Sequence, residues 1–437
     1  MLKQNMLVLL MAAAIAWVSS GCQQQGSGNG QTAQDSAGLH FDSSNGGLTL
    51  PAGFKAVVVA QNIGRARHLA IRDNGDIYVG LNSMKNGGGI VALRDVNGDG
   101  IADSIVYFGH DHGSGAAIHN GYLYFAEDTA VIRFKLVEGS LLPDTAHPEL
   151  LVTLPVQHEH EAKSITFDGS GNMYVNVGAP SNACQVEDRT KGSPGQQPCP
   201  LLENHAGIWR FSDSQPNQTQ QNGGSRYATG LRNCVALAWN PAVNKLYAAM
   251  HGRDQLNQLY PQYYNEQQGA ETPAEEFFQI KEGGNYGWPY VYYDLSKQKL
   301  MVCPEYGGDG KKESPEGKYE DPIMAFPGHW APNGLLFYTG DQFPSQYKNG
   351  AFIAFHGSWN RAPLPQGGYK VVFVPFNGDK PAGDSTVFAD NFAGTDSLQN
   401  PGDAKHRPVG LAQGPDGSLY ITDDSNGYIW RIVYTGQ

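Results

Sequence analysis

The sequence has few charged residues, and basic residues are fewer than acidic ones. Charged residues make up 16% of the 437, with 30 Lys and Arg against 42 Asp and Glu, so the formal net charge is -12 at pH 7. Affinity for nucleic acid depends on Lys and Arg that neutralise phosphates. The balance therefore argues against a nucleic-acid partner and suits a soluble protein with cation sites.

Helical patterning is also lacking. No window after residue 20 keeps the apolar periodicity of an amphipathic helix, whereas 55 Gly and 26 Pro supply many turns. The composition favours an all-β chain.

Long hydrophobic runs are absent except near the N-terminus. Lys3 precedes an apolar run over 7–18, which is too short to span a membrane as a helix. The small residues before Cys22 resemble a bacterial lipobox, so residues 1–21 are expected to be a lipoprotein signal peptide, with Cys22 lipidated. Residues 22–46 are polar and Gly-rich and are expected to form a flexible tether. The alternative is an ordinary signal peptide with a chance cysteine.

Cysteine is scarce, and no CxxC pair exists for a metal site. Cys184, Cys199, Cys234 and Cys303 remain in a chain expected to be exported, where an even number favours disulfides. Cys184 and Cys199 bracket a Pro/Gly-rich loop and are the preferred pair, with Cys234 and Cys303 as the remainder. Three connectivities exist, and the sequence does not choose among them.

One short sequence motif is abundant, a turn followed by a run of aromatic or β-branched residues. Its copies begin at Asn74, Asn120, Gly171, Asn244, Asn333, Asn349 and Asp416. Asn-Gly and Asp-Gly accept positive φ and favour hairpins, and reuse of one unit is typical of repeat architectures. The pattern predicts a β-propeller over 47–437 as one domain, in which the closing strand often pairs with the first.

One loop has the spacing of a calcium site. Its oxygen-bearing side chains alternate around a Gly turn, as at the start of an EF-hand loop, and they are Asp95, Asn97, Asp99 and Asp103. The twelfth position is Val106 rather than Glu. The alternatives are a structural calcium ion and an Asp/Asn/Gly turn without an ion.

Several other segments offer groups for chemistry. His158 and His160 would share a face if they lay on a strand, and a neutral His near a strand could act as a general base. Arg232 and Asn233 suit a planar, oxygen-rich ligand. Lys405, His406 and Arg407 precede the last strands of an acidic chain and suggest an anionic ligand. Solvated loops and surface patches are the alternatives for each.

Taken together, these segments resemble the glucose/sorbosone dehydrogenase family, soluble quinoproteins with six-bladed propellers that bind pyrroloquinoline quinone (PQQ) and calcium. The phrases that carry the resemblance are His160 before its strand, Gly230-Leu231-Arg232-Asn233, His251-Gly252-Arg253-Asp254, Glu275-Glu276-Phe277, Gly283-Gly284-Asn285-Tyr286-Gly287-Trp288-Pro289, His356-Gly357-Ser358-Trp359-Asn360-Arg361, and Arg407 with Asp423. The fifth-blade phrase is more similar to the L-sorbosone dehydrogenase branch.

The resemblance implies a role for each matching residue. His160 would take the hydroxyl proton of the substrate, and Arg232 would stabilise the cofactor oxyanion. Asn233, Lys405, Arg407, Asp423, His356 and Arg361 would contact PQQ. Gly252, Arg253 and Asp254 would hold its calcium ion, and Glu275 would lie near the substrate. Arg253 replaces the Pro of the glucose enzymes, Val235 stands about where a Gln is expected, and His356 or Arg361 replaces a Lys.

The function expected from the resemblance is oxidation of a sugar or sugar aldehyde in the bacterial cell envelope, on the periplasmic side of a membrane, by a lipid-anchored enzyme. The substrate and the electron acceptor, a quinone or cytochrome, are left open. One alternative is a non-catalytic propeller lipoprotein that binds glycan or protein partners. Another is a calcium-dependent lactone hydrolase, which needs carboxylates that converge on a central metal.

Overall fold

A computed structural model describes residues 38–436, and its main feature is a set of six sheets that each contain four antiparallel strands of one propeller blade. The first three blades are β2 (Ala66–Ile71), β3 (Ile77–Lys85), β4 (Gly88–Arg94) and β5 (Ser104–Phe108); β6 (Gly113–His119), β7 (Tyr122–Glu127), β8 (Ala130–Lys135) and β9 (Glu149–Thr153); and β10 (Ile165–Phe167), β11 (Asn172–Val177), β12 (Gly207–Ser212) and β13 (Ser225–Thr229). The other three are β14 (Ala236–Asn240), β15 (Lys245–Met250), β16 (Glu275–Ile280) and β20 (Met324–Phe326); β21 (Pro332–Phe337), β22 (Ala351–Phe355), β23 (Lys370–Val374) and β26 (Thr386–Ala389); and β27 (Pro408–Gln413), β28 (Leu419–Asp423), β29 (Ile429–Tyr434) and β1 (Phe54–Ala60). The predicted all-β, six-bladed propeller is confirmed.

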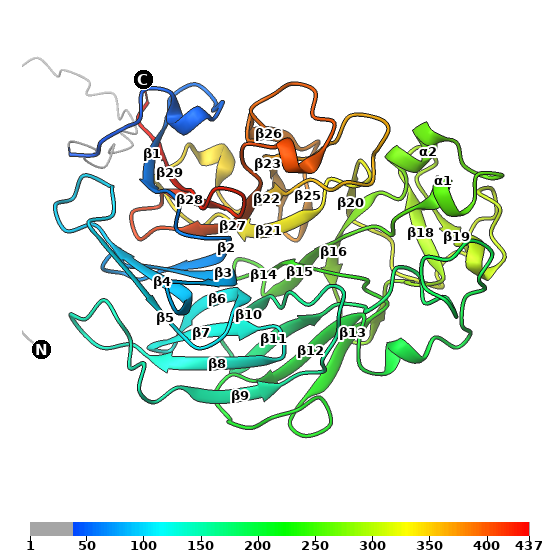
Figure 1. Ribbon diagram of the computed structural model, residues 1–437, viewed down its shortest axis with the longest axis horizontal. Helices are drawn as coiled ribbons and strands as arrows, with labels where there is room; N and C mark the ends of the chain where they lie inside the picture. The colour runs from blue at the N-terminus through cyan, green and yellow to red at the C-terminus, as the bar shows by residue number, and fades with distance from the viewer. Residues whose placement is uncertain (1–37, 437) are drawn as a thin grey trace, which may run out of the picture. The chain divides into compact units, whose positions relative to one another are not determined.

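The ring is closed by a strand from early in the chain. β1 pairs with β29 in antiparallel register, from Phe54 opposite Tyr434 to Val58 opposite Trp430. Figure 1 shows the blue strand β1 beside the red strand β29. The expected pairing of the first and last strands is therefore present. It covers the edge of β29 and makes β1 the outermost strand of the sixth blade.

The first strand of each blade lines a central channel. These innermost strands contact one another in a closed ring, from β2 through β6, β10, β14, β21 and β27 back to β2. The space between them is a cavity of about 380 Å³ lined mainly by small and apolar side chains, with His68 among its walls. Each blade therefore has its innermost strand, and the loops at the ends of that strand, close to the propeller axis.

Apolar clusters fill each junction between neighbouring blades. Six separate clusters of buried residues form, and each takes its side chains from two adjacent blades. Trp430 and Phe352, for example, belong to the cluster between the fifth and sixth blades. Burial of apolar surface at about 25 cal/mol per Å² therefore stabilises the closed ring at every junction.

The repeated motif marks the turn between the first two strands of each blade. Gly75, Gly121, Gly171, Asn244, Asn349 and Gly417 all have positive φ at these turns. The copy at Asn333 is an exception, because Asn333 and Gly334 lie inside β21. A Cβ on Gly334 would stand 2.2 Å from the carbonyl oxygen of Val409, so glycine is needed here for close approach of two innermost strands.

The end of the predicted tether is ordered against the propeller. The 3-10 turn η1 (Asn45–Gly47) lies here, and the amide of Ala56 donates to the Asn45 side chain at 3.0 Å. The amide of His40 donates to the carbonyl of Asp99 at 2.7 Å. Residues in the last part of the predicted tether therefore contact the propeller. The signal peptide, Cys22 and the rest of the tether lie outside the described residues.

The remaining elements are short and belong to loops between blade strands. They are α1 (Leu256–Leu259), α2 (Glu266–Glu271), β17 (Gly284–Asn285), β18 (Val291–Asp294), β19 (Lys299–Val302), β24 (Phe376–Asn377), β25 (Lys380–Pro381), η2 (Pro200–Glu203), η3 (Pro304–Tyr306), η4 (Ser345–Tyr347) and η5 (Pro401–Asp403). In Figure 1, α1, α2, β18 and β19 lie together in the green and yellow part of the chain. Among residues 38–436, no helix has the length and apolar character needed to cross a membrane.

Candidate active site

The candidate site lies at one end of the channel, where innermost strands begin and second strands end. In the fourth blade the amide of His251, just after β15, donates to the carbonyl of Asn233, just before β14, at 2.9 Å. In the sixth blade Pro408 pairs with Asp423. The antiparallel hairpins thus bring loop residues from different blades to the same end of the channel.

His160 is held in one orientation. Its Nδ1 lies 2.5 Å from the carbonyl oxygen of Ala179. A carbonyl only accepts, so Nδ1 carries the proton and the Nε2 of the neutral ring has a free lone pair. Burial, followed by the nearby Arg232, lowers the pKa of His160 to about 3. The backbone φ of 53° is left-handed, an unusual conformation that often occurs at functional sites.

His158 does not join His160. It is exposed, and residues 158–160 form a bend rather than a strand. The condition under which both imidazoles would share a face, a strand through these residues, is therefore not met, because the chain leaves extended geometry at His160. One imidazole, not a pair, belongs to the site.

Arg232 is buried and nearly saturated with hydrogen bonds. It donates Nε to the Asn182 carbonyl at 3.2 Å, Nη1 to the Gly252 carbonyl at 3.0 Å, and Nη2 to the Asn182 side chain at 3.1 Å. Its Nη2 also lies 3.0 Å from a carboxylate oxygen of Asp254. Burial lowers the pKa of Arg232, and Asp254 opposes that shift.

Asp254 is the counterion of this cluster. Burial would raise its pKa, but Arg232, His329 and Arg189 outweigh burial and lower it to about 2. Arg189 lies 3.2 Å from the Asp254 carboxylate and also pairs with Glu159. The charge of Arg232 is therefore fixed and partly balanced next to His160.

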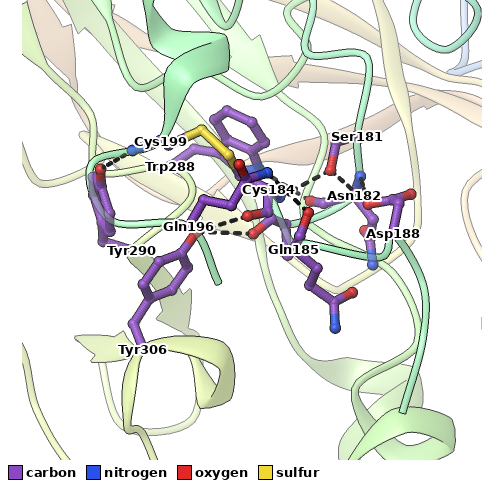
Figure 2. Close-up of a disulfide and its surroundings, with 11 residues drawn as sticks. Ser181, Asn182, Cys184, Gln185, Asp188, Gln196, Cys199, Trp288, Tyr290 and Tyr306 are labelled. Atoms are coloured by element: carbon purple, nitrogen blue, oxygen red, sulfur yellow. Dashed lines mark hydrogen bonds between the residues drawn. A yellow bond between two sulfur atoms is a disulfide. The ribbon is translucent and has the colours of Figure 1, made fainter. Parts of the chain in front are cut away.

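Asn182, which accepts two hydrogen bonds from Arg232, is held in a disulfide-bonded loop. Cys184 and Cys199, the preferred pair, are joined, with a Cα to Cα distance of 6.2 Å. Figure 2 shows Trp288 beside this disulfide and the bonds that join Ser181, Asn182 and Asp188. The Trp288 indole donates to the same Asn182 carbonyl at 3.0 Å. The loop thus fixes both oxygens that Asn182 presents to Arg232.

Two further histidines line the same end. His251 lies 2.9 Å from the Pro332 carbonyl through Nε2, and His68 lies 2.7 Å from the Asn333 carbonyl through Nε2. Burial lowers the pKa of each to about 4. Both rings are therefore neutral donors. His251 ties the fourth blade to the adjacent fifth, whereas His68 of the first blade reaches the fifth blade past the sixth. Asn233 precedes β14 near His251, and its side-chain oxygen accepts from the Asn176 amide at 3.4 Å.

A second basic group comes from the other side of the channel. Arg407 donates Nε to the His356 carbonyl at 3.2 Å and Nη2 to the Gly357 carbonyl, and within residues 38–436 its Nη1 has no protein partner. His356 lies 2.9 Å from Asp424, whose other oxygen pairs with the buried Arg67 at 3.1 Å. Burial has the largest effect on the pKa of His251, and Arg232 from one side and His356 from the other lower this pKa further.

Four residues expected to contact PQQ or the substrate have protein partners or are exposed, and their predicted roles stay predictions. Asp423 is fully buried and accepts from the amides of Arg407, Ser425 and Asn426 and from His406, so it is a turn anchor. The Arg361 guanidinium donates to the carbonyls of Ala270 and Gly328 and to the Glu271 carboxylate, the last at 2.6 Å. Lys405 is exposed and lies beside Gly394 and Gly47.

Glu275 is the fourth, because it is buried and faces the protein backbone. Its two oxygens accept from the amides of Gly252 and Ala331, both at 3.0 Å. Burial raises its pKa to about 7. Glu275 therefore positions the loop that contains Gly252.

The three predicted ligands of the cofactor calcium lie in one loop but are mostly engaged. The Gly252 carbonyl and the Asp254 carboxylate bind Arg232, and the Arg253 guanidinium forms a buried pair with Glu305 at 2.5 Å. The Arg253 carbonyl accepts no bond from other residues of the described chain. A calcium ion bound here would compete with Arg232 for Gly252.

The predicted structural calcium loop is a hydrogen-bonded turn. Asp95 accepts from the amides of Gly98 and Gly100, both at 2.7 Å, and Asp103 accepts from Val96 at 2.6 Å. Asn97 and Asp99 accept from amides two residues ahead. Across residues 38–436, no three His, Cys, Asp or Glu side chains gather in a way that could hold a metal ion. The alternative of carboxylates around a central metal has no counterpart in this part of the chain.

The second disulfide that the sequence allowed is absent. Cys234 and Cys303 are both free and buried, and burial raises the pKa of each thiol well above its ordinary range. Cys234 packs in the cluster between the third and fourth blades, whereas Cys303 belongs to a cluster under the α1 and β18 loops. The two thiols therefore serve different apolar clusters.

Sequence reasoning missed Arg67, His68, Asn182 and Arg189. Arg67 and His68 stand at the start of β2, much as Arg407 stands at the start of β27, so aligning the repeats would have indicated them. Asn182 and Arg189 carry no such signal, because their loop has no counterpart in the other blades.

Comparison with known proteins gives one family. The TrAA12-like family model matches residues 48–435. A pyrroloquinoline quinone-dependent pyranose dehydrogenase of Coprinopsis cinerea is 27% identical over 278 residues, which are 55% of this chain and 36% of that protein. A pyrroloquinoline quinone-dependent sugar dehydrogenase of Hypocrea jecorina is 24% identical over 415 residues, 90% of this chain and 84% of that protein. The chain spans less than half the length of the first curated relatives it matches.

A solved structure supports the architecture. The calcium structure of the Trichoderma reesei enzyme of carbohydrate-active enzyme family AA12 has a TM-score of 0.71 and 19% identity, and the match covers 89% of this chain and 97% of that one. At this identity the likeness concerns the fold.

Proposed function

Because the chain belongs to the TrAA12-like family, we propose that it is a quinoprotein dehydrogenase that oxidises a sugar or sugar aldehyde with PQQ as cofactor. Two curated relatives are named as PQQ-dependent dehydrogenases of pyranose or sugar. The observation that carries the proposal is the oriented, neutral His160 beside the fixed charge of Arg232. A base and a cation at one channel end suit removal of a proton from an alcohol while negative charge develops nearby.

The residues present fit a planar, acidic cofactor. Arg67, Arg232 and Arg407 bring positive charge to the channel end, and Nη1 of Arg407 has no partner within residues 38–436. The side-chain oxygen of Asn333 is also buried without a partner in this range. We therefore assign Arg407 and Arg232 to cofactor contacts, whereas the Asn333 oxygen is an acceptor and would need a donor from a ligand. When bound, PQQ supplies a carbonyl that accepts a hydride from the substrate carbon.

His160 would act on the substrate hydroxyl. The Ala179 carbonyl holds the proton on Nδ1, so Nε2 accepts the hydroxyl proton without a change of tautomer. Arg232 keeps its charge close to the reaction and disfavours a resting imidazolium. Such a base contributes about 10²–10⁴ in rate.

The decisive experiment is a cofactor titration with a matched pair of variants. Purified protein is titrated with PQQ and calcium, and turnover of a panel of aldoses is followed with an artificial acceptor. His160→Ala is expected to bind PQQ normally and to lose about 10²–10⁴ in kcat. His158→Ala is the control, because this exposed ring lies two residues away and has no role in the site.

Two results would overturn the assignment. If wild-type protein fails to bind PQQ at micromolar concentration, the non-catalytic propeller that binds glycans or proteins takes its place. If His160→Ala and His158→Ala have equal turnover, the base is another group.

Calcium dependence forms a separate part of the proposal. The free Arg253 carbonyl and the neighbouring oxygens of Gly252 and Asp254 are the groups that would hold the ion beside PQQ. Chelation is expected to release PQQ from the loaded protein, and added calcium to restore binding. Retention of PQQ after complete chelation, checked by metal analysis, would exclude calcium from the site.

We also propose that the protein acts at the periplasmic face of a bacterial membrane, attached by a lipid on Cys22. The support is the lipobox-like sequence that ends at Cys22. Cys22→Ser is expected to move the protein from the membrane fraction to the soluble fraction. A variant that remains with membranes would show that another segment anchors it. A quinone or a cytochrome of that membrane would serve as the electron acceptor.

A further inference from the structure

A second cavity opens at the same end of the propeller as the candidate site. It has a volume of about 370 Å³ and lies between the start of β23 and the loop that follows β26. Its walls include Thr49, Trp330, Gln366, Tyr369, Lys370 and Asp390. Its size falls in the range of about 300–1,000 Å³ that is usual for small-ligand sites.

The walls of this cavity are fixed by backbone hydrogen bonds. Thr49 and Asp390 exchange amide-to-carbonyl bonds at 3.1 and 3.0 Å. The amide of Gln366 donates to Leu398 at 2.7 Å, and the amide of Gly357 donates to Trp330 at 2.7 Å. The cavity is therefore preformed, which lowers the entropy cost of binding.

The lining has the chemistry of a polyhydroxylated, uncharged ligand. An indole supplies an apolar surface, and amide, hydroxyl and carboxylate groups supply partners for hydroxyls. Lys370 lies 3.4 Å from Asp390 and 5.5 Å from the centre of the Trp330 ring. Asp396 adds a second carboxylate against this one cation, so the cavity disfavours an anion such as PQQ.

One group in the lining lacks a partner. The Tyr369 side chain is 4% exposed, and its hydroxyl has no hydrogen-bond partner within residues 38–436. A buried hydroxyl without a partner carries a desolvation cost, which a ligand hydroxyl could remove. The Tyr369 ring also lies 5.8 Å from the guanidinium carbon of Arg407, so it borders the candidate site.

We propose that this cavity is a saccharide subsite, which binds one unit of a neutral oligosaccharide beside the channel end that holds Arg407. That such an oligosaccharide is also oxidised rests on the proposed function, whereas its binding in the cavity does not. The substrate class would then be oligosaccharides rather than single sugars.

The test measures binding to PQQ-free protein, so it does not depend on turnover. Cellotetraose, maltotetraose and mannotetraose are titrated into the PQQ-free protein by calorimetry, with glucose as the single-unit comparison. We expect one tetrasaccharide to bind with a millimolar or lower Kd and glucose to bind at least about tenfold more weakly.

Three variants locate the binding. Trp330→Ala is expected to weaken the tetrasaccharide by about tenfold or more. Trp330 also packs on Phe355, so Tyr369→Phe is the sharper variant, because it removes only an unpartnered hydroxyl and leaves the melting temperature unchanged or higher. It is expected to weaken the tetrasaccharide several-fold. Trp359→Ala is the control, because this indole is 50% exposed and does not line the cavity.

The outcomes separate the two proposals. If none of the tetrasaccharides binds at millimolar concentration, or if Tyr369→Phe and Trp330→Ala bind like the control, the subsite is wrong, whatever the enzyme does. If a tetrasaccharide binds and the variants weaken it but the PQQ-loaded protein never oxidises a sugar, the subsite stands and the proposed function fails.

Discussion

At the residue scale, the site depends on where single protons lie. His160 is neutral because burial and Arg232 both disfavour its protonation, and the Ala179 carbonyl selects which nitrogen carries the proton. Neither condition follows from the presence of histidine in the sequence. Each follows from the loop geometry that places the ring between Ala179 and Arg232.

This arrangement predicts an unusual pH dependence of kcat/KM. A histidine base with its ordinary pKa of 6.5 would lose activity below that pH, but His160, with a pKa of about 3, stays unprotonated. The profile measured in the free enzyme should therefore have no acidic limb near pH 6.5. An inflection near pH 7 would come from Glu275, whose pKa is about 7, and should vanish in Glu275→Gln. A limb near pH 6.5 that persists in Glu275→Gln would contradict this assignment of His160.

At the element scale, hairpins and loops contribute differently. The innermost hairpin of each blade turns at a Gly or Asn with positive φ, whereas the loop over 181–199 obtains its shape from a disulfide and from Asn182, Trp288 and Asp188. Hairpins provide the scaffold, and this loop provides the partners of Arg232.

Removal of the disulfide should therefore weaken both the fold and the site. The bond closes a loop with a sequence separation of 15, for which loop entropy gives about 3 kcal/mol. We expect the double variant Cys184→Ser with Cys199→Ser to unfold at lower denaturant and to bind PQQ less tightly, since Asn182 loses its support. Cys303→Ala, which removes a free thiol, is the control for loss of a cysteine. Equal midpoints for wild type and the double variant would refute the structural role.

These elements also show what the sequence could predict. Turn chemistry is local, so it indicated the innermost hairpin of every blade, and it failed at Asn333-Gly334, where glycine serves close packing instead. His160 and Arg232 were placed at one channel end by motif resemblance. The surroundings of Lys405, Asp423 and Glu275 did not follow from the motifs, because a motif identifies a position in the chain and the side-chain direction depends on distant backbone groups.

At the scale of the whole molecule, buried ionisable groups set the pH range of stability. His68, His160 and His251 have pKa values of about 4, 3 and 4 in the folded protein, below the ordinary 6.5. The unfolded chain therefore binds more protons below pH 6.5, and stability falls as pH decreases from there. Glu275 and Glu276 have pKa values raised by burial to about 7 and 8, so their contribution is lost as pH rises through these values.

The free energy of unfolding should accordingly be greatest between about pH 6 and 7. Denaturant titrations from pH 4 to 9 would measure it, with Glu276→Gln expected to flatten the alkaline limb. A monotonic rise of stability through pH 9 in the wild type would show that these glutamates are ionised in the folded state.

Closure of the ring by β1 and β29 has a consequence for biosynthesis. A ribosome or translocase releases β1 long before β29, so the sixth blade has no partner strand until the chain is almost complete. Until then, β1 presents an unpaired edge of apolar residues, a form that chaperones bind and proteases cleave. A nascent chain stalled before β27 would keep that edge exposed, and quality control could distinguish it from the finished protein by this one missing strand pair.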